Sequence, residues 1–293
     1  MKDYVLLADL PEDQRVAYFA ALFAMSAADG TLDKEEVSLI LETLETDGLS
    51  EEASRRLRSY VVDPPPMEQA LGGLAGAPEE VQHGLMLQLV EVALADGLIE
   101  EGEQRELIEA QRALDVSDEQ LQAMMGFALE AKRIRERGID DAYAADALKA
   151  AAAGLTATGV PLAAIVYSGS VVGLSAAGIT SGLAALGLGL GMVGGIGVVI
   201  LIGAGIYVGV TRLLDVGGKR KKARLQRERE RKAQLAIKNL QEMIGHLVDQ
   251  VAELQRGAAD AAANRVAIEQ LNKRLRAMKQ LLENRKQSLA HAA

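Results

Sequence analysis

Two short acidic stretches carry the residues of this sequence that are best suited to chemistry. Residues 28–36 read ADGTLDKEE and residues 95–103 read ADGLIEEGE, 67 positions later. Carboxylates at this density could hold a divalent cation or form the surface that binds a partner. The candidate ligands are Asp29, Asp33, Glu36, Asp96, Glu100 and Glu103.

A structural interpretation of the same residues competes with the metal site. A calcium loop of the EF-hand kind needs alternating oxygen ligands over about twelve residues, and this spacing does not supply them. Gly30 and Gly97 can end one helix in the left-handed conformation, and the acidic residues after them can cap the next helix. We favour caps on the spacing alone, although both roles can hold at once. No other cofactor is indicated.

Enzyme chemistry finds little support elsewhere in the chain. There is no Cys, and the three His residues (His83, His246 and His291) have no partners at ligand spacing. Residues 189–194 fit a GxGxxG pattern, but no preceding strand or βαβ unit accompanies them. We therefore expect a protein that is not an enzyme.

The residues that flank the acidic stretches predict an all-α domain over residues 1–140. Phe19, Leu22 and Phe23 lie at helical spacing, and Ser50 and Ser117 each precede acidic residues, as helix caps do. Pro64, Pro65 and Pro66 interrupt the series. No stretch alternates with a period of two for long enough to predict a sheet.

The doubled ADG motif resembles the TerB-like family, the helical domain of tellurite resistance. The resemblance covers roughly residues 11–137 and implies two pseudo-symmetric helical repeats joined at these motifs. It also implies a stress-response setting and keeps the divalent cation under consideration. The second copy departs from the first, because Gly102 stands where the first has Glu35.

Charge divides the chain into two halves. Residues 1–148 hold 12 Lys and Arg against 32 Asp and Glu, a net charge of −20, whereas residues 149–293 hold 20 against 9, a net charge of +11. A basic half is suited to an anionic surface. The N-terminal residues reach Asp9 and Pro11 before any apolar core of useful length, which predicts no signal peptide.

Residues 150–211 contain no Asp, Glu, Lys, Arg or His over 62 positions. A single membrane crossing needs about 20 apolar residues, so this stretch predicts a two-helix transmembrane hairpin within a segment 141–217. We expect crossings at about 151–175 and 183–210. Basic residues flank both ends and none lies in the turn, which predicts that both termini face the cytoplasm of a bacterial inner membrane.

Fifteen glycines fall within this stretch, several of them four residues apart. Such spacing lets helix backbones approach closely in lipid, although a plain small-residue anchor is an equal alternative. The candidate packing residues are Gly169, Gly173, Gly187, Gly191, Gly195, Gly205 and Gly209.

The last segment, residues 218–293, predicts a basic coiled-coil arm. Its first residues are candidates for binding anionic lipid headgroups, and nucleic acid is not expected because acidic residues interrupt the basic run and aromatics are absent. Headgroup candidates are Lys219, Arg220, Lys221, Lys222 and Arg224. An expected coiled-coil seam follows, made of Ile237, Leu240, Ile244, Leu247, Val251 and Leu254. A second seam from Ile268 to Leu282 favours an antiparallel hairpin over one long dimeric coiled coil.

These features predict a membrane-anchored TerB-like scaffold or sensor of the bacterial envelope or stress response. Tellurite, phage or colicin resistance is the setting that the resemblance implies. The acidic head would recruit an unidentified protein partner, and the arm would form a homo-oligomer. The alternative is a pore-forming or membrane-remodelling protein whose glycine-rich hairpin inserts on a trigger.

Overall fold

Every regular element in the described part of the computed structural model is a helix. That part comprises residues 7–30, 34–95, 97–137, 142–161, 164, 219–256 and 261–292. The helices are η1 (Leu7–Asp9), α1 (Glu12–Met25), α2 (Lys34–Thr43), α3 (Glu51–Ser59), α4 (Met67–Gly72), α5 (Glu79–Ala93), α6 (Glu101–Ala113), α7 (Asp118–Arg137), α8 (Ala142–Ala157), α12 (Lys219–Arg256) and α13 (Ala261–Ala292). The all-α prediction is confirmed for these residues.

Helices α1 and α5 form the centre of the N-terminal unit, which we call the head (η1 to α8). Both are buried on nearly all sides, as their almost continuous apolar sequences require. Two buried polar contacts link them to each other and to α2: the Tyr18 hydroxyl donates to Gln88 Oε1 at 3.0 Å, and Gln88 Nε2 donates to the Thr43 hydroxyl at 2.7 Å. These bonds tie α1, α5 and α2 together.

The head contains a three-helix repeat whose period is 67 residues. Helices α1, α2 and α3 begin at Glu12, Lys34 and Glu51, and α5, α6 and α7 begin at Glu79, Glu101 and Asp118. Ser50 and Ser117 match as well, because each hydroxyl accepts a hydrogen bond at 3.1 Å from the backbone N–H three residues later. The repeat detected in two short motifs thus extends over three helices.

Left-handed backbone recurs at the same positions of both repeats. Gly30 and Gly97 have φ of 80° and 105°, and Gly48 and Asp115 have φ of 77° and 53°. Among the described residues, Asp115 is the one non-glycine with positive φ, a conformation that Asp tolerates better than most residues. The turns, and not only the helices, are therefore repeated.

Helix α8 packs against α7 and extends the head beyond its expected boundary at residue 140. Ala152 and Leu155 are buried in the same core as the repeats. The helix ends at Ala157, Gly159 follows with a φ of +87°, and the Val160 N–H donates to the Leu155 carbonyl at 3.3 Å. Residues 151–157, where the first crossing was expected to begin, thus belong to a helix of the head.

Apart from residues 158–161 and 164, the rest of the expected transmembrane hairpin, with its glycine pairs, lies outside the described residues and stays a prediction. None of the helices that the structure describes has both the length and the apolar character that a membrane crossing needs.

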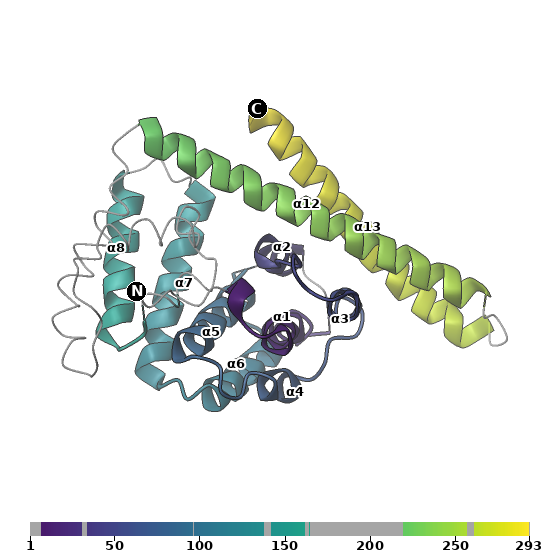
Figure 1. Ribbon diagram of the computed structural model, residues 1–293, viewed down its shortest axis with the longest axis horizontal. Coiled ribbons are helices and arrows are strands. Elements are labelled where there is room, and N and C mark those ends of the chain that lie inside the picture. The colour runs from purple at the N-terminus through teal and green to yellow at the C-terminus, as the bar shows by residue number, and fades with distance from the viewer. Residues whose placement is uncertain are drawn as a thin grey trace.

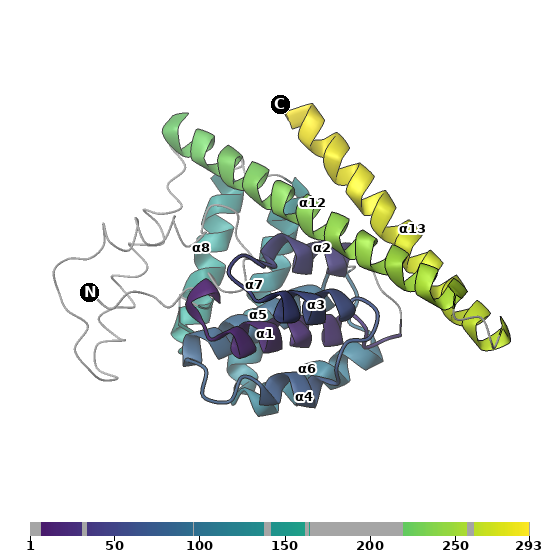
Figure 2. The same cartoon turned by 45° about the vertical axis from the view of Figure 1, so that its right-hand side comes forward.

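Helices α12 and α13 form an antiparallel hairpin, which we call the arm. It lies across α2 and α3 and projects beyond the head (Figure 1), and the turned view agrees (Figure 2). Of the two alternatives for this segment, the antiparallel hairpin is the one observed. Leu247 on α12 and Leu271 and Met278 on α13 are buried.

Candidate functional site

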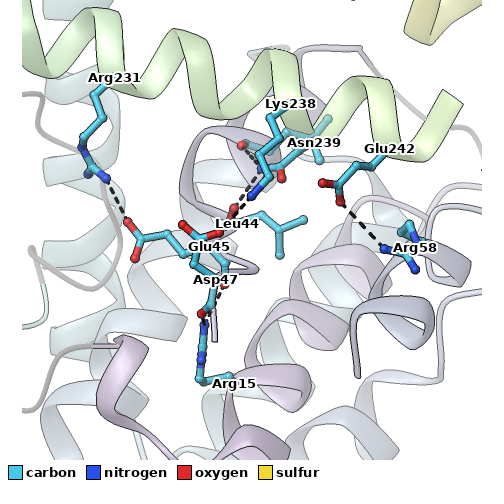
Figure 3. Close-up of polar contacts among 10 residues, drawn as sticks. Arg15, Leu44, Glu45, Asp47, Arg58, Arg231, Lys238, Asn239 and Glu242 are labelled. Carbon is cyan, nitrogen blue, oxygen red and sulfur yellow. Dashed lines mark hydrogen bonds and ion pairs between the residues drawn. The ribbon is translucent and has the colours of Figure 1, made fainter. Parts of the chain in front are cut away.

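The head and the arm meet at the C-terminal end of α2. The last carbonyls of any helix lack partners within it. Here the Asn239 side-chain amide of α12 donates to the Leu41 and Leu44 carbonyls, at 2.9 and 2.8 Å. Asn239 is only 1 % exposed, so this cap is shielded from water. An arm residue therefore completes a head helix (Figure 3).

Arg15 holds the same segment from the other side. Its guanidinium, on α1, donates to the Glu45 and Asp47 carbonyls at 2.8 and 3.0 Å. The Arg15 side chain is buried, and a cation at a helix C-terminus also interacts favourably with the helix dipole. Residues 44–48 are thus fixed between α1 and α12 (Figure 3).

Ion pairs surround the buried amide. Arg231 Nη1 lies 3.1 Å from Glu45 Oε1, and Lys238 Nζ lies 2.9 Å from Asp47 Oδ1. The hydrogen bond from Lys238 lowers the pKa of Asp47, and the same bond raises the pKa of Lys238. Exposed pairs of this kind contribute at most about 1 kcal/mol each, so they orient the arm more than they bind it.

Apolar packing supplies the rest of the contact. Ala236, Leu240 and Met243 are buried on α12, at a spacing of three and four residues, and belong to one core with Leu41 and Leu57 of the head. This stripe differs from the predicted seam, because Ala236 and Met243 lie on a neighbouring face of the helix. One face of α12 therefore carries both the apolar stripe and the cap.

Helix α13 contributes two arginines. Arg274 donates to the Val61 and Val62 carbonyls after α3, at 3.0 and 2.6 Å. Arg285 pairs with Glu42 and donates to the Ser38 hydroxyl on α2. Burial lowers the pKa of both guanidinium groups, and Asp63 opposes that effect at Arg274. Arginine stays charged despite such shifts, so Arg285 forms an ion pair with Glu42 and Arg274 donates charge-assisted hydrogen bonds.

The repeat explains why the arm binds α2 and not α6. The arm's partners at positions 38 and 42 of α2, and at 45 and 47 just after it, are Ser, Glu, Glu and Asp. The residues 67 positions later are Arg105, Glu109, Arg112 and Leu114. Two acidic partners of the arm are thus replaced, one by arginine. Ile108, the counterpart of the buried Leu41, is 37 % exposed. This side of α6 lines an open groove of about 910 Å³ with α4.

The acidic stretches act mainly in turns and caps where they are described. The Glu100 side chain accepts from the backbone at Glu103, and Glu103 Oε2 accepts from the Glu100 N–H at 2.8 Å, which is a capping box. Glu36 and Glu103, at matching positions of the two repeats, are buried, whereas Asp29 is exposed.

No three acidic or histidine side chains converge as metal ligands among the described residues. Asp33 and Asp96 lie outside that part of the chain, so the metal site of six carboxylates stays a prediction.

Gly102 brings the two stretches together. A Cβ at this position would lie 2.3 Å from the Ala28 carbonyl oxygen and 3.2 Å from the Asp29 nitrogen. The first turn of α6 therefore rests directly on the backbone that follows α1. The departure of the second motif from the first, glycine in place of Glu35, is what this close approach requires.

The structure describes only some of the other residues that were predicted to function in the arm. Lys219, Arg220, Lys221, Lys222 and Arg224 form the first turns of α12, and their side chains lie outside the described part. In the predicted seam, Leu240 and Leu247 are buried, whereas Ile237, Ile244, Val251 and Leu254 are half-buried. The seam is therefore only partly covered by α13 and the head.

Sequence reasoning missed the residues that join the arm to the head. Asn239, Arg274 and Arg285 were not singled out, because a polar residue beside a heptad seam reads as solvent-exposed. One signal was present in the sequence. Ala236, Asn239 and Met243 are three and four residues apart, so they form a second stripe beside the seam, with the Asn239 amide in its middle.

Searches against protein-family models, curated proteins and solved structures return no match. The resemblance to the TerB-like family therefore stays a proposal. The geometry itself describes a charge-matched contact between an acidic head and a basic arm.

Proposed function

We propose that this chain is a membrane-anchored, non-enzymatic scaffold or sensor with a TerB-like head. In this proposal the part of the apolar stretch that follows the described end of the head, residues 165–211, enters a bacterial inner membrane as a helical hairpin, and the head and arm remain in the cytoplasm. The acidic surface of the head recruits a protein partner, and the arm supports homo-oligomers. The TerB resemblance adds an envelope or stress-response setting, such as tellurite, phage or colicin resistance.

The observation that carries the proposal is the contact between α12 and α2. These helices stand on opposite sides of the 62-residue apolar stretch in the sequence, yet Asn239 bonds directly to Leu41 and Leu44. While this contact holds, both flanks lie on one side of any membrane that the stretch enters. A docked arm therefore implies an even number of crossings, and the 47 residues from 165 to 211 suffice for two of about 20 residues each.

Carbonate extraction of membranes tests the anchor. We expect the full chain to resist extraction and a chain lacking residues 165–211 to be released. This deletion removes none of the described residues of the head or the arm, so both should still fold. A full chain found in the soluble fraction would contradict a permanent anchor.

That second result would support a different function, a hairpin that inserts on a trigger. One observation favours it: Ala152 and Leu155, near the start of the apolar stretch, are buried in the head core and are 3 % and 1 % exposed. In this alternative the head shields the apolar stretch until a signal releases it. Vesicle leakage by a chain purified without detergent would distinguish it from a scaffold.

A further inference from the structure

We propose that the face of α12 that docks on the head is also a binding surface for an anionic bilayer, and that head and bilayer compete for it. This inference rests on the proposed function, because the membrane anchor brings α12 to the bilayer. It goes further by assigning a second partner to a contact that is closed in the structure.

The composition of this face fits a membrane surface. Ala236 and Met243 are buried apolar residues of this face, and Arg231 and Lys238 lie along one edge of the same contact, where they pair with Glu45 and Asp47. An apolar stripe bordered by cations is the pattern of helices that lie in the headgroup layer. The bilayer would cover the apolar surface that the head now covers, so release of the arm does not leave this surface in water.

The two cations cannot serve both partners at once. Arg231 and Lys238 lie within 3.1 Å of Glu45 and Asp47 in the docked arm, and these carboxylates would be repelled by anionic headgroups. Both cations are about half exposed, so lipid phosphates can reach them. Phosphate and carboxylate are alternative acceptors for the same donors.

The position of α12 directly after the apolar stretch favours its contact with the bilayer. Helix α12 begins at Lys219, eight residues after the apolar stretch, with a run of basic residues. At about 1.5 Å per residue, Arg231 lies roughly 18 Å and Lys238 roughly 28 Å from the start of the helix. Electrostatic attraction decays within about 10 Å, so both cations reach headgroups only when α12 lies along the surface. Docking on the head and lying on the bilayer are thus two orientations of one helix.

The test measures the arm position in the full chain inserted into vesicles. The chain has no Cys, so a spin label can be placed at each of two exposed sites, Arg55→Cys on α3 and Gln241→Cys on α12. Double electron–electron resonance then reports docked and released arms as two distances. The probes are vesicles of phosphatidylcholine alone and of phosphatidylcholine mixed with phosphatidylglycerol.

We expect the ratio of released to docked arms to rise about 30-fold in the anionic vesicles, since each of two cations contributes a factor of about five. The double variant Arg231→Gln/Lys238→Gln should bring this rise close to one. The matched double variant Arg276→Gln/Lys279→Gln removes two exposed cations of α13 and should preserve the rise. Inorganic phosphate added to neutral vesicles should leave the arm docked.

Each other outcome overturns a specific claim. An arm equally docked in both vesicles, in a chain that inserts into both, overturns this inference and leaves the anchor intact. A rise that survives Arg231→Gln/Lys238→Gln shows that this face is not the lipid surface. Release by soluble phosphate shows that the bilayer is not the competitor. A chain that floats with neither vesicle overturns the proposed function and this inference together.

Discussion

Side chains from distant elements complete the helix ends of this protein. Asn239 and Arg15 meet the carbonyls at the end of α2, Arg274 meets those after α3, and Lys132 of α7 donates to the Leu94 carbonyl after α5 at 2.9 Å. Each pairing satisfies acceptors that the helix cannot satisfy itself. Residue-scale changes at these points should therefore alter tertiary contacts more than helix content.

Asn239→Asp should release the arm without unfolding the head. The carboxylate keeps the size of the amide but loses both donors, and it faces two carbonyl oxygens in a buried site. Leaving such acceptors unsatisfied costs about 1–3 kcal/mol. The docked fraction, measured by the label pair on α3 and α12, should fall, while circular dichroism should show an unchanged helix content. Asn272→Asp, a half-buried site on α13, is the control and should leave docking intact.

Gly102→Ala should destabilise the head by about 1–3 kcal/mol, because its Cβ would overlap the Ala28 carbonyl, which is backbone and cannot rotate away. This cost outweighs the gain of up to about 1 kcal/mol that alanine normally brings to a helix. Gly126→Ala on α7 is the matched control, since nothing lies within 4 Å of its Cβ, and it should stabilise the head. Urea unfolding of both variants gives the comparison, and equal shifts would contradict the close approach of the two repeats.

At the scale of elements, the sequence pattern predicted the helices and their ends but not the contacts between distant helices. Apolar spacing, glycines and Ser50 and Ser117 predicted the helices and their caps, because these signals act within a few residues. The contact between α12 and α2 could not be predicted from such local signals. It depends on Asn239 meeting carbonyls of a helix far away in the sequence, and periodicity holds no information about that partner. The role of Gly102 was hidden for the same reason.

The junction of α12 with α3 should make arm docking sensitive to pH. Burial lowers the pKa of His246, Arg58 of α3 lowers it further, and Asp249 of α12 opposes them. Glu242 of α12, 3.8 Å from Arg58, also lies in this cluster. A lowered pKa means that the docked arm holds the His246 proton less tightly than the released arm does. Docking should thus be complete above about pH 7 and weaken as the pH falls through the usual His range of about 6.5.

The same label pair measures this effect between pH 7.5 and pH 5.5. His246→Gln should remove most of the pH dependence while the arm stays docked at neutral pH. Burial also lowers the pKa of His83 in the head, so the free energy of unfolding of the head should decrease as the pH falls. His83→Gln is therefore the control: it should change unfolding but not the pH dependence of docking. An unchanged profile in His246→Gln would assign the dependence to another group.

At the scale of the whole molecule, opposite charge unites two halves that the apolar stretch separates. The head half carries −20 and the arm half +11, and their contact is built from pairs such as Arg231 with Glu45 and Arg285 with Glu42. Charge that appeared in the sequence as a guide to membrane orientation thus also serves an internal contact. The two roles agree, because a docked arm requires both flanks to lie on one side.

Labelling of single cysteines in sealed vesicles checks that geometry. Arg55→Cys on α3 and Lys279→Cys on α13 should react with a membrane-impermeant thiol reagent from the same side, since the head and the arm form one body. Ala177→Cys, in the turn expected between the crossings, should react only from the opposite side. Two crossings satisfy both results, whereas a single crossing would place Arg55 and Lys279 on opposite sides. That pattern would mean that α12 leaves α2 whenever the chain enters a membrane, and the docked arm would then belong to a state outside the bilayer.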